Sequence, residues 1–334
     1  FPTSYTAIAR GAAETTEEET LIDEKEDSED EDYASNIPAA EDRSVKASSK
    51  LGIMDFERGL ESGTFLHSLF EKIDFTVVKN ASLGIPEAEN NLNKILTRLM
   101  TPFQYHLQPY GVEGYLPVFN RLMKDVLCAK LVDKSVFGTT SDIRLCDLDP
   151  NRKTPEMSFT ISIGTPSEGR VAVSAKNLSR LLAHFEPIYH IEIENDLVLK
   201  GYLTGAIDLT FELDGQYFVL DWKGTKLAQT PEGFTQERIL EEINRHHYSL
   251  QYLIYLVALR RHLRLCGIDN PDEKIAGAIY AFIRGIRRDD EKPYGVFTAR
   301  VPSSLIACLD DFFEKGYHEG VVTAYAAASK EEGF

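Results

Sequence analysis

The sequence predicts an α/β fold, on three observations from its second half. Residues 199–224 alternate apolar and polar side chains around an Asp214-Gly215 turn, which indicates a β-hairpin. Residues 236–265 form a helical pattern that is apolar on nearly every side after Tyr248, as is typical of a helix buried in a core. Residues 275–286 then have the pattern of a buried strand. Strands and helices therefore alternate along this part of the chain.

The first fifty residues differ in composition from the rest. Twelve acidic residues and one basic residue lie between Glu14 and Asp32, and they account for eleven of the seventeen net negative charges of the 334-residue chain. Such a segment buries too little apolar surface to offset the entropy of ordering, so residues 14–50 are expected to form a disordered acidic linker or loop. Residues 1–13 are expected to be a lead-in segment that docks on a folded domain spanning residues 51–334.

Between residues 51 and 175 the pattern predicts three helices and a pair of strands. Apolar side chains recur at helical spacing over 63–75, and further helices are expected over 88–99 and 116–131. Residues 157–163 alternate like a strand, and residues 171–175 are expected to be its hairpin partner.

Features that the sequence lacks exclude several classes of protein. The longest apolar runs, 253–259 and 275–283, are shorter than the roughly 20 residues that span a bilayer, so a soluble protein without a membrane partner is expected. The four cysteines are far apart and form no C-x-x-C pair, which argues against zinc and iron–sulfur sites and fits reduced thiols in the cytoplasm. No G-x-x-x-x-G-K-[ST] loop occurs, which excludes an ATPase or helicase motor within these residues. The chain begins with Phe1 and lacks a signal-peptide pattern, so it is expected to be a domain of a longer polypeptide.

The hairpin turn fixes a predicted register. With a two-residue turn at Asp214-Gly215, Leu209 faces Leu220 and Ile207 faces Trp222, and this apolar side is expected to pack on helices.

The opposite side of the hairpin carries titratable groups. In the same register Asp208 faces Asp221, and Lys223 stands two residues further along on the same side. Two opposed carboxylates repel each other unless a positive charge lies between them, and Mg²⁺ accepts such oxygen ligands while keeping several waters. The alternative is an exposed sheet face on which Asp208 pairs diagonally with Lys223.

The long helix and the strand after it supply further candidates. Gln251 and Tyr255 are i and i+4 neighbours, so they would present an amide and a phenol together, unless the tyrosine only packs in the core. Six arginines could contact phosphates or form a solvated basic face: Arg260, Arg261, Arg264, Arg284, Arg287 and Arg288.

Four segments resemble the C-terminal nuclease domain of the RecB family, the beta chain of exodeoxyribonuclease V. They are GTFLHSLFEKIDF at 63–75, LKGYLTGAIDLTFELDGQYFVLDWKG at 199–224, HHYSLQYLIYLVALRRHLR at 246–264 and GAIYAFIRGI at 277–286. Their order and approximate spacing match over most of residues 51–315, and TSYTAIAR at 3–10 resembles the segment that leads into this domain. The resemblance implies the PD-(D/E)XK, restriction-endonuclease-like fold, a central mixed sheet flanked by helices, with extra helices at the N-terminus.

The resemblance also implies a metal site. Its ligands would be His67, Asp208, Asp221 and the backbone carbonyl of Trp222, with Glu156 as a further candidate. From the composition of its segment alone, His67 would be interpreted as a polar residue on the open side of an amphipathic helix. The implied cofactor is Mg²⁺, as one or two ions.

The implied catalytic residues overlap with these ligands. They are Asp208, Asp221, Lys223 at the motif lysine position, Glu156 at an upstream acidic position, and Gln251 and Tyr255 in a Q-x-x-x-Y helix.

The function implied by the resemblance is hydrolysis of DNA phosphodiester bonds in double-strand-break repair, recombination and degradation of linear DNA. A helicase portion together with RecC and RecD chains would feed single strands of DNA to the site. Two alternatives remain: a free-standing PD-(D/E)XK endonuclease, and a catalytically inactive DNA-binding or scaffold module. The intact set of Asp208, Asp221 and Lys223 argues against the inactive module.

Overall fold

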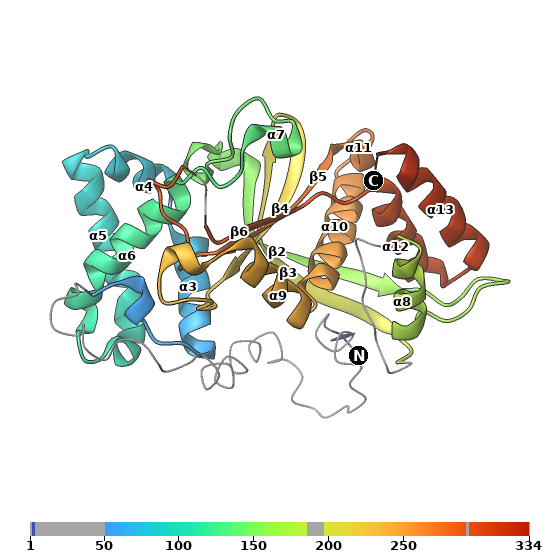
Figure 1. Cartoon of the computed structure of the whole chain (residues 1–334), viewed down its shortest axis with the longest axis horizontal. Coiled ribbons are helices and arrows are strands. Elements are labelled where there is room, and N and C mark those ends of the chain that lie inside the picture. The colour runs from blue at the N-terminus through green and yellow to red at the C-terminus, as the bar shows by residue number, and fades with distance from the viewer. Residues whose placement is uncertain (1, 4–50, 186–196, 292–293, 334) are drawn as a thin grey trace.

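A mixed β-sheet with helices packed on both faces forms the body of the protein (Figure 1). The computed structural model describes residues 2–3, 51–185, 197–291 and 294–333. The predicted acidic linker, residues 14–50, lies outside the described residues, and so does the lead-in segment except for residues 2–3. Among the described helices, none combines the length and the apolar composition needed to cross a membrane.

The sheet contains six described strands, of which five follow the order β1-β3-β4-β5-β6, and β2 also pairs with β3. Neighbouring strands are antiparallel except for two parallel pairs, β1 with β3 and β4 with β5. The strands are β1 (Pro2–Thr3), β2 (Lys153–Ile163), β3 (Gly201–Leu213), β4 (Gln216–Lys223), β5 (Ile275–Phe282) and β6 (Val296–Ala299).

Helices from the N-terminal half cover one face of the sheet. They are α3 (Leu60–Lys72), α4 (Phe75–Ser82), α5 (Pro86–Met100), α6 (Gly111–Cys128) and α7 (Lys134–Phe137). Helices that contribute to the core on the other face are α8 (Ala175–Ala183), α9 (Gln236–Arg245), α10 (Tyr248–Leu265), α12 (Ser303–Lys315) and α13 (Glu319–Glu331), while α11 (Pro271–Lys274) packs against α10 and α12. Short 3₁₀ helices lie at Ile53–Asp55, Thr101–Leu107, Leu145–Asp147, Pro150–Arg152 and Pro231–Gly233.

The sheet separates two hydrophobic cores. In β4, Phe218 and Leu220 pack toward α3 to α6, whereas Val219 packs toward α10, as the two-residue period of a strand requires. Both faces of this strand are therefore apolar until it reaches Asp221.

Most of the predicted helices are confirmed with shifted boundaries. The helices predicted for 63–75, 88–99 and 116–131 correspond to α3, α5 and α6. The long helix predicted for 236–265 is divided into α9 and α10, because the backbone at His247 adopts a left-handed φ of 53°.

The predicted hairpin between 157–163 and 171–175 is wrong. Strand β2 pairs along its length with β3, and residues 171–175 make only isolated bridges among the described residues, from Val171 to Tyr317 and from Ser174 to Val198. The correct partner is 38 residues or more away in the sequence, so local alternation could not identify it.

The register of the second hairpin is confirmed near the turn and changes beyond it. Leu209 pairs with Leu220, and the turn residues Asp214 and Gly215 have φ of 55° and 78°, as this turn requires. The recorded β3–β4 pairs end at Leu209, so the predicted pair of Ile207 with Trp222 is absent from the ladder. Ile207 packs in the core beside α10, while Leu209 packs in the other core. Asp208 lies where the two strands separate.

Candidate active site

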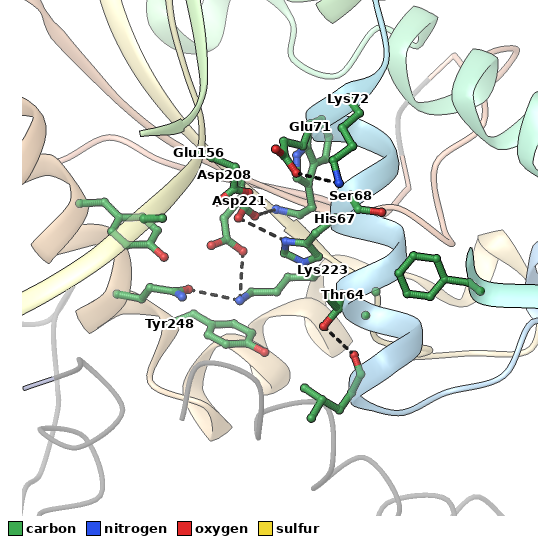
Figure 2. A pocket seen from close by; sticks show the side chains of 18 residues that line it. Thr64, His67, Ser68, Glu71, Lys72, Glu156, Asp208, Asp221, Lys223 and Tyr248 are labelled. Atoms are coloured by element: carbon green, nitrogen blue, oxygen red, sulfur yellow. Dashed lines mark hydrogen bonds and ion pairs between the residues drawn. The ribbon is translucent and has the colours of Figure 1, made fainter. Parts of the chain in front are cut away.

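A cavity of about 420 Å³ opens where β3 and β4 separate (Figure 2). Its walls come from α3, β2, β3, β4 and α10. It brings together all of the catalytic and metal-binding residues predicted from the sequence: His67, Glu156, Asp208, Asp221, Trp222, Lys223, Gln251 and Tyr255.

Three carboxylates lie across three neighbouring strands at this cavity. The register of β2 with β3 places Glu156 opposite Asp208, between two recorded pairs of the ladder. Glu156 has a φ of 48°, a left-handed conformation that is uncommon for a residue other than glycine and is often found at functional sites. Asp221 follows the last recorded pair on the other side of β3. Figure 2 shows the three side chains grouped beside α3.

Both carboxylate oxygens of Asp208 have a partner. Oδ2 accepts a hydrogen bond from the main-chain N–H of Trp222 at 2.7 Å, and Oδ1 lies 3.2 Å from His67 Nδ1. The Asp208 carboxylate thus accepts a hydrogen bond from a main-chain N–H of β4 at the point where the main chains of β3 and β4 no longer pair. The indole of Trp222 stacks on Phe70 of α3, with ring centroids 4.3 Å apart. Helix α3, which carries His67, is therefore fixed against β4.

Three of the predicted residues form a group suited to a metal ion. One ligand atom from each of His67, Glu156 and Asp208 lies within 4.8 Å of the others. An imidazole nitrogen and two carboxylate oxygens are a donor set that accepts Mg²⁺ or Mn²⁺. Asp221 lies outside this group among the described residues, and its Oδ2 is 3.0 Å from the ammonium of Lys223. Asp221 and the carbonyl of Trp222 as ligands stay predictions.

The protonation of these groups reflects burial and close charges. Burial alone would lower the pKa of His67, but the charge and hydrogen bond of Asp208 outweigh it and raise this pKa to about 9. Burial raises the pKa of Asp208, yet His67, the Trp222 N–H and Lys223 lower it below the ordinary value. Burial raises the pKa of Asp221 to about 7 against the effect of Lys223, and Asp208 adds to the increase. A cation that binds at His67 must therefore displace a proton.

Lys223 is enclosed rather than solvated. Its ammonium lies 3.0 Å from Asp221 Oδ2, donates to Gln251 Oε1 at 3.3 Å, and lies 3.9 Å from the ring centroid of Tyr248. Lys223 and Asp221 are 8% and 3% exposed. The alternative of an exposed sheet face, with Asp208 paired to Lys223, is therefore wrong, because Lys223 pairs with Asp221 and both are buried in the cavity wall.

Besides Gln251, helix α10 supplies one further predicted residue, Tyr255, and one unexpected residue, Tyr248, to the cavity wall. The ring of Tyr255 packs edge to face on Phe159 of β2, with centroids 5.8 Å apart, and also borders the cavity. Tyr248 was not predicted as a site residue. Its position three residues before Gln251, on the same helix face, is a signal that could have identified it.

Comparison with known proteins agrees with this geometry. A family model described as the PD-(D/E)XK nuclease superfamily matches residues 165–330, which contain Asp208, Asp221 and Lys223. The chain belongs to the PD-(D/E)XK nuclease superfamily. The predicted fold and the predicted family are thereby confirmed.

This nuclease is similar to RecB subunits of several bacteria. It is 32% identical over 285 residues to the RecBCD enzyme subunit RecB of Escherichia coli (strain K12), covering 83% of this chain and 21% of that protein. The same subunit of Haemophilus influenzae is 29% identical over 264 residues, 78% of this chain and 19% of that protein. That of Mycobacterium tuberculosis (strain ATCC 25618 / H37Rv) is 37% identical over 128 residues, 36% of this chain and 12% of that protein. The chain is thus similar to a RecB-type nuclease domain and spans at most about a fifth of the length of these relatives.

Three of the arginines predicted to contact DNA surround one carboxylate at the far end of α10 of the nuclease. Arg260 and Arg261 bond to the buried Asp310 of α12, and Arg264 lies 3.8 Å from it. Arg260 also donates to Asp272 at 2.6 Å and is buried. The guanidinium of Arg260 therefore holds α10, α11 and α12 together, and we omit it from the proposed DNA-binding residues.

Arg284 also has a structural role in place of the predicted one. Its guanidinium is 1% exposed and donates at 2.6–2.8 Å to four main-chain carbonyls, which belong to Ile53, Phe56, Glu57 and Gly224. It therefore holds the segment before α3 against the segment after β4. Because it is buried, it is not available to DNA. Arg287 and Arg288 each donate to a main-chain carbonyl as well, and their contact with DNA stays a prediction.

Replacing Arg284 by alanine is expected to lower the free energy of unfolding by about 3–5 kcal/mol, because several buried carbonyls lose their donor at ~1–3 kcal/mol each. Urea unfolding followed by circular dichroism measures this change. Arg264→Ala, at a side chain that is 56% exposed, is the matched control and should change the stability by less than about 0.5 kcal/mol. Equal stability of the two variants would contradict the structural role of Arg284.

Proposed function

We propose that this domain hydrolyses phosphodiester bonds of DNA in a Mg²⁺-dependent reaction, as the nuclease of a RecBCD-type helicase-nuclease. One observation supports this most directly. His67, Glu156 and Asp208 form a group suited to a divalent cation, and it borders the same cavity as the ion pair of Asp221 and Lys223. Cation ligands and a fixed ammonium side by side are what hydrolysis of an anionic diester requires.

The chemistry follows from the charge of the substrate. Water must attack a phosphorus shielded by anionic oxygens, so the site has to supply positive charge. A divalent ion held by His67, Glu156 and Asp208 would supply charge to a phosphate oxygen and lower the pKa of a water. Lys223 contributes a second positive charge, and its contacts with Asp221 and Gln251 keep the ammonium in the cavity wall.

The biological setting is proposed from the RecB similarity. The relatives are several times longer than this chain, so the helicase motor would lie outside these residues and the partners would be separate chains. In this proposal the domain acts in the cytoplasm with RecC and RecD chains, on single strands fed from the end of a broken duplex. Its role would be double-strand-break repair, recombination and degradation of linear DNA.

The experiment that tests this function is cleavage of labelled linear DNA, single-stranded and double-stranded, with Mg²⁺ and with EDTA. We expect cleavage that EDTA abolishes and that added Mg²⁺ restores. Binding of DNA without cleavage, in Mg²⁺ and in Mn²⁺, would instead support the inactive binding module. Efficient cleavage of covalently closed circular DNA would favour a free-standing endonuclease.

A further inference from the structure

Tyr280 lies in the middle of β5 and was expected only to be part of a buried strand. In the parallel ladder it is the partner of Asp221 on β4, and its side chain is 1% exposed. It packs in the core beside α10, so it lies behind the cavity wall rather than in the cavity lining. Its contacts lead to the proposed catalytic lysine.

The hydroxyl of Tyr280 holds the Gln251 side chain beside Lys223. It donates to Gln251 Oε1 at 2.7 Å, and the same oxygen accepts from Lys223 Nζ at 3.3 Å. An amide oxygen has two lone pairs, so two donors satisfy it. If the amide turned over, its NH₂ group would face the ammonium of Lys223, and two donors would oppose each other. The lysine therefore selects the amide orientation, and the tyrosine hydroxyl holds the amide oxygen where it can accept from the lysine.

The aromatic rings complete an enclosure around the same ammonium. Lys223 Nζ lies 3.9 Å from the ring centroid of Tyr248 and 5.4 Å from that of Tyr280, distances at which a cation is attracted to a ring face. The two rings stack with centroids 5.5 Å apart. The Tyr280 hydroxyl also lies 3.3 Å from the main-chain carbonyl of Tyr248, which ties the first residue of α10 to β5.

We propose that Tyr280 is a positioning residue, which holds the Lys223 ammonium at the cavity through the Gln251 amide and the Tyr248 ring. This inference rests on the proposed function for the meaning of the lysine, and adds to it a residue that does not touch the substrate. Asp221 restrains the ammonium by an ion pair, while Tyr280 restrains it through Gln251 and Tyr248. The lysine then needs no reorganisation when a phosphate arrives.

The test is Tyr280→Phe, which keeps the ring and removes the hydroxyl. In steady-state cleavage of labelled single-stranded DNA with Mg²⁺, kcat should fall about tenfold, with KM changed by less than about twofold, since one orienting hydrogen bond is lost and no substrate contact. Tyr252→Phe is the matched control, because it removes the hydroxyl of another buried tyrosine whose ring centroid is 6.1 Å from that of Tyr280. The control should retain kcat within about twofold.

A double-mutant cycle separates positioning from a general loss of stability. In a Gln251→Ala background, Tyr280→Phe should lower kcat by less than about twofold, since most of its effect passes through the amide. Additive losses, an unchanged kcat, or an effect confined to KM would overturn the proposal.

A second readout does not need catalysis. With ¹⁵N-labelled lysine, the Lys223 side chain should give a ring-shifted NMR signal, and Tyr280→Phe should move that signal toward the position of exposed lysines while Tyr252→Phe leaves it unchanged. A wild-type protein that shows this signal but cuts no DNA would contradict the proposed function and not the role of Tyr280. A signal unaffected by Tyr280→Phe would contradict the role of Tyr280 alone.

Discussion

Replacing Lys223 by alanine is expected to lower the rate of DNA cleavage by about 100- to 1000-fold, the range seen when a fixed charge aimed at a reacting oxyanion is removed. The ammonium is held by Asp221 and Gln251 and borders the cavity, so solvent cannot replace it in the same place. Single-turnover cleavage of labelled DNA at saturating Mg²⁺ measures the change.

Lys72→Ala is the control for Lys223→Ala. Lys72 also borders the cavity, but its side chain is 52% exposed and approaches a carboxylate, that of Glu71, only at 3.8 Å. Its loss should cost less than about fivefold, because an exposed charge is screened by water and salt. Equal losses in the two variants would show that positive charge in general matters, not the enclosed ammonium.

The Lys223→Ala variant should also be less stable than the wild type, because Lys223 is buried and not on an exposed sheet face. It leaves the buried Asp221 without its ion pair. Burial already raises the pKa of Asp221 to about 7, and without the ammonium that lowers this pKa the carboxylate takes up a proton more readily. Circular dichroism should show the native secondary structure with a lower melting temperature.

Changing Asp208 to asparagine is expected to weaken divalent-cation binding by roughly 100-fold, because affinity for such ions depends on the number of charged ligands. Asparagine keeps an oxygen that can accept from the Trp222 N–H, so the junction of β3 and β4 should remain. Calorimetric titration with Ca²⁺ or Mn²⁺ measures the affinity without any substrate.

Glu71→Gln is the matched control for the cation site. Glu71 borders the same cavity one turn after His67 on α3, but it lies outside the group of three ligand residues. We expect its affinity for the ion to stay within about threefold of the wild type, as befits a charge that is near the ion without contacting it. A loss as large as that of Asp208→Asn would place the ion elsewhere in the cavity.

The hairpin could be predicted from sequence because its determinants are local. The Asp214-Gly215 turn and the alternation on both sides fix the register, and Asp208 and Asp221 each lie one residue beyond its last pair, Leu209 with Leu220. The point at which the strands separate could not be predicted in this way. It depends on the Asp208 carboxylate bonding to the Trp222 N–H, which no periodicity records.

Residues brought to the site by distant elements were harder to identify. His67 and Glu156 lie on α3 and β2, and the family resemblance, not their own segments, identified them as candidates. Tyr280 meets Asp221 through a parallel ladder between strands that α9 and α10 separate in the sequence, so its position follows from the tertiary fold. Arg284 looked like a DNA contact because a buried guanidinium bonded to main-chain carbonyls has the same sequence signature as an exposed one.

Trp222 is the single tryptophan of the chain and lies between Asp221 and Lys223 in the sequence. Its indole stacks on Phe70 of α3. Tryptophan fluorescence, excited at wavelengths that tyrosine does not absorb, therefore reports on one junction, where α3 meets β4. During refolding, an emission change that lags behind the recovery of helical circular dichroism would time the docking of these two elements. The protein thus carries an optical probe of active-site assembly that needs no label.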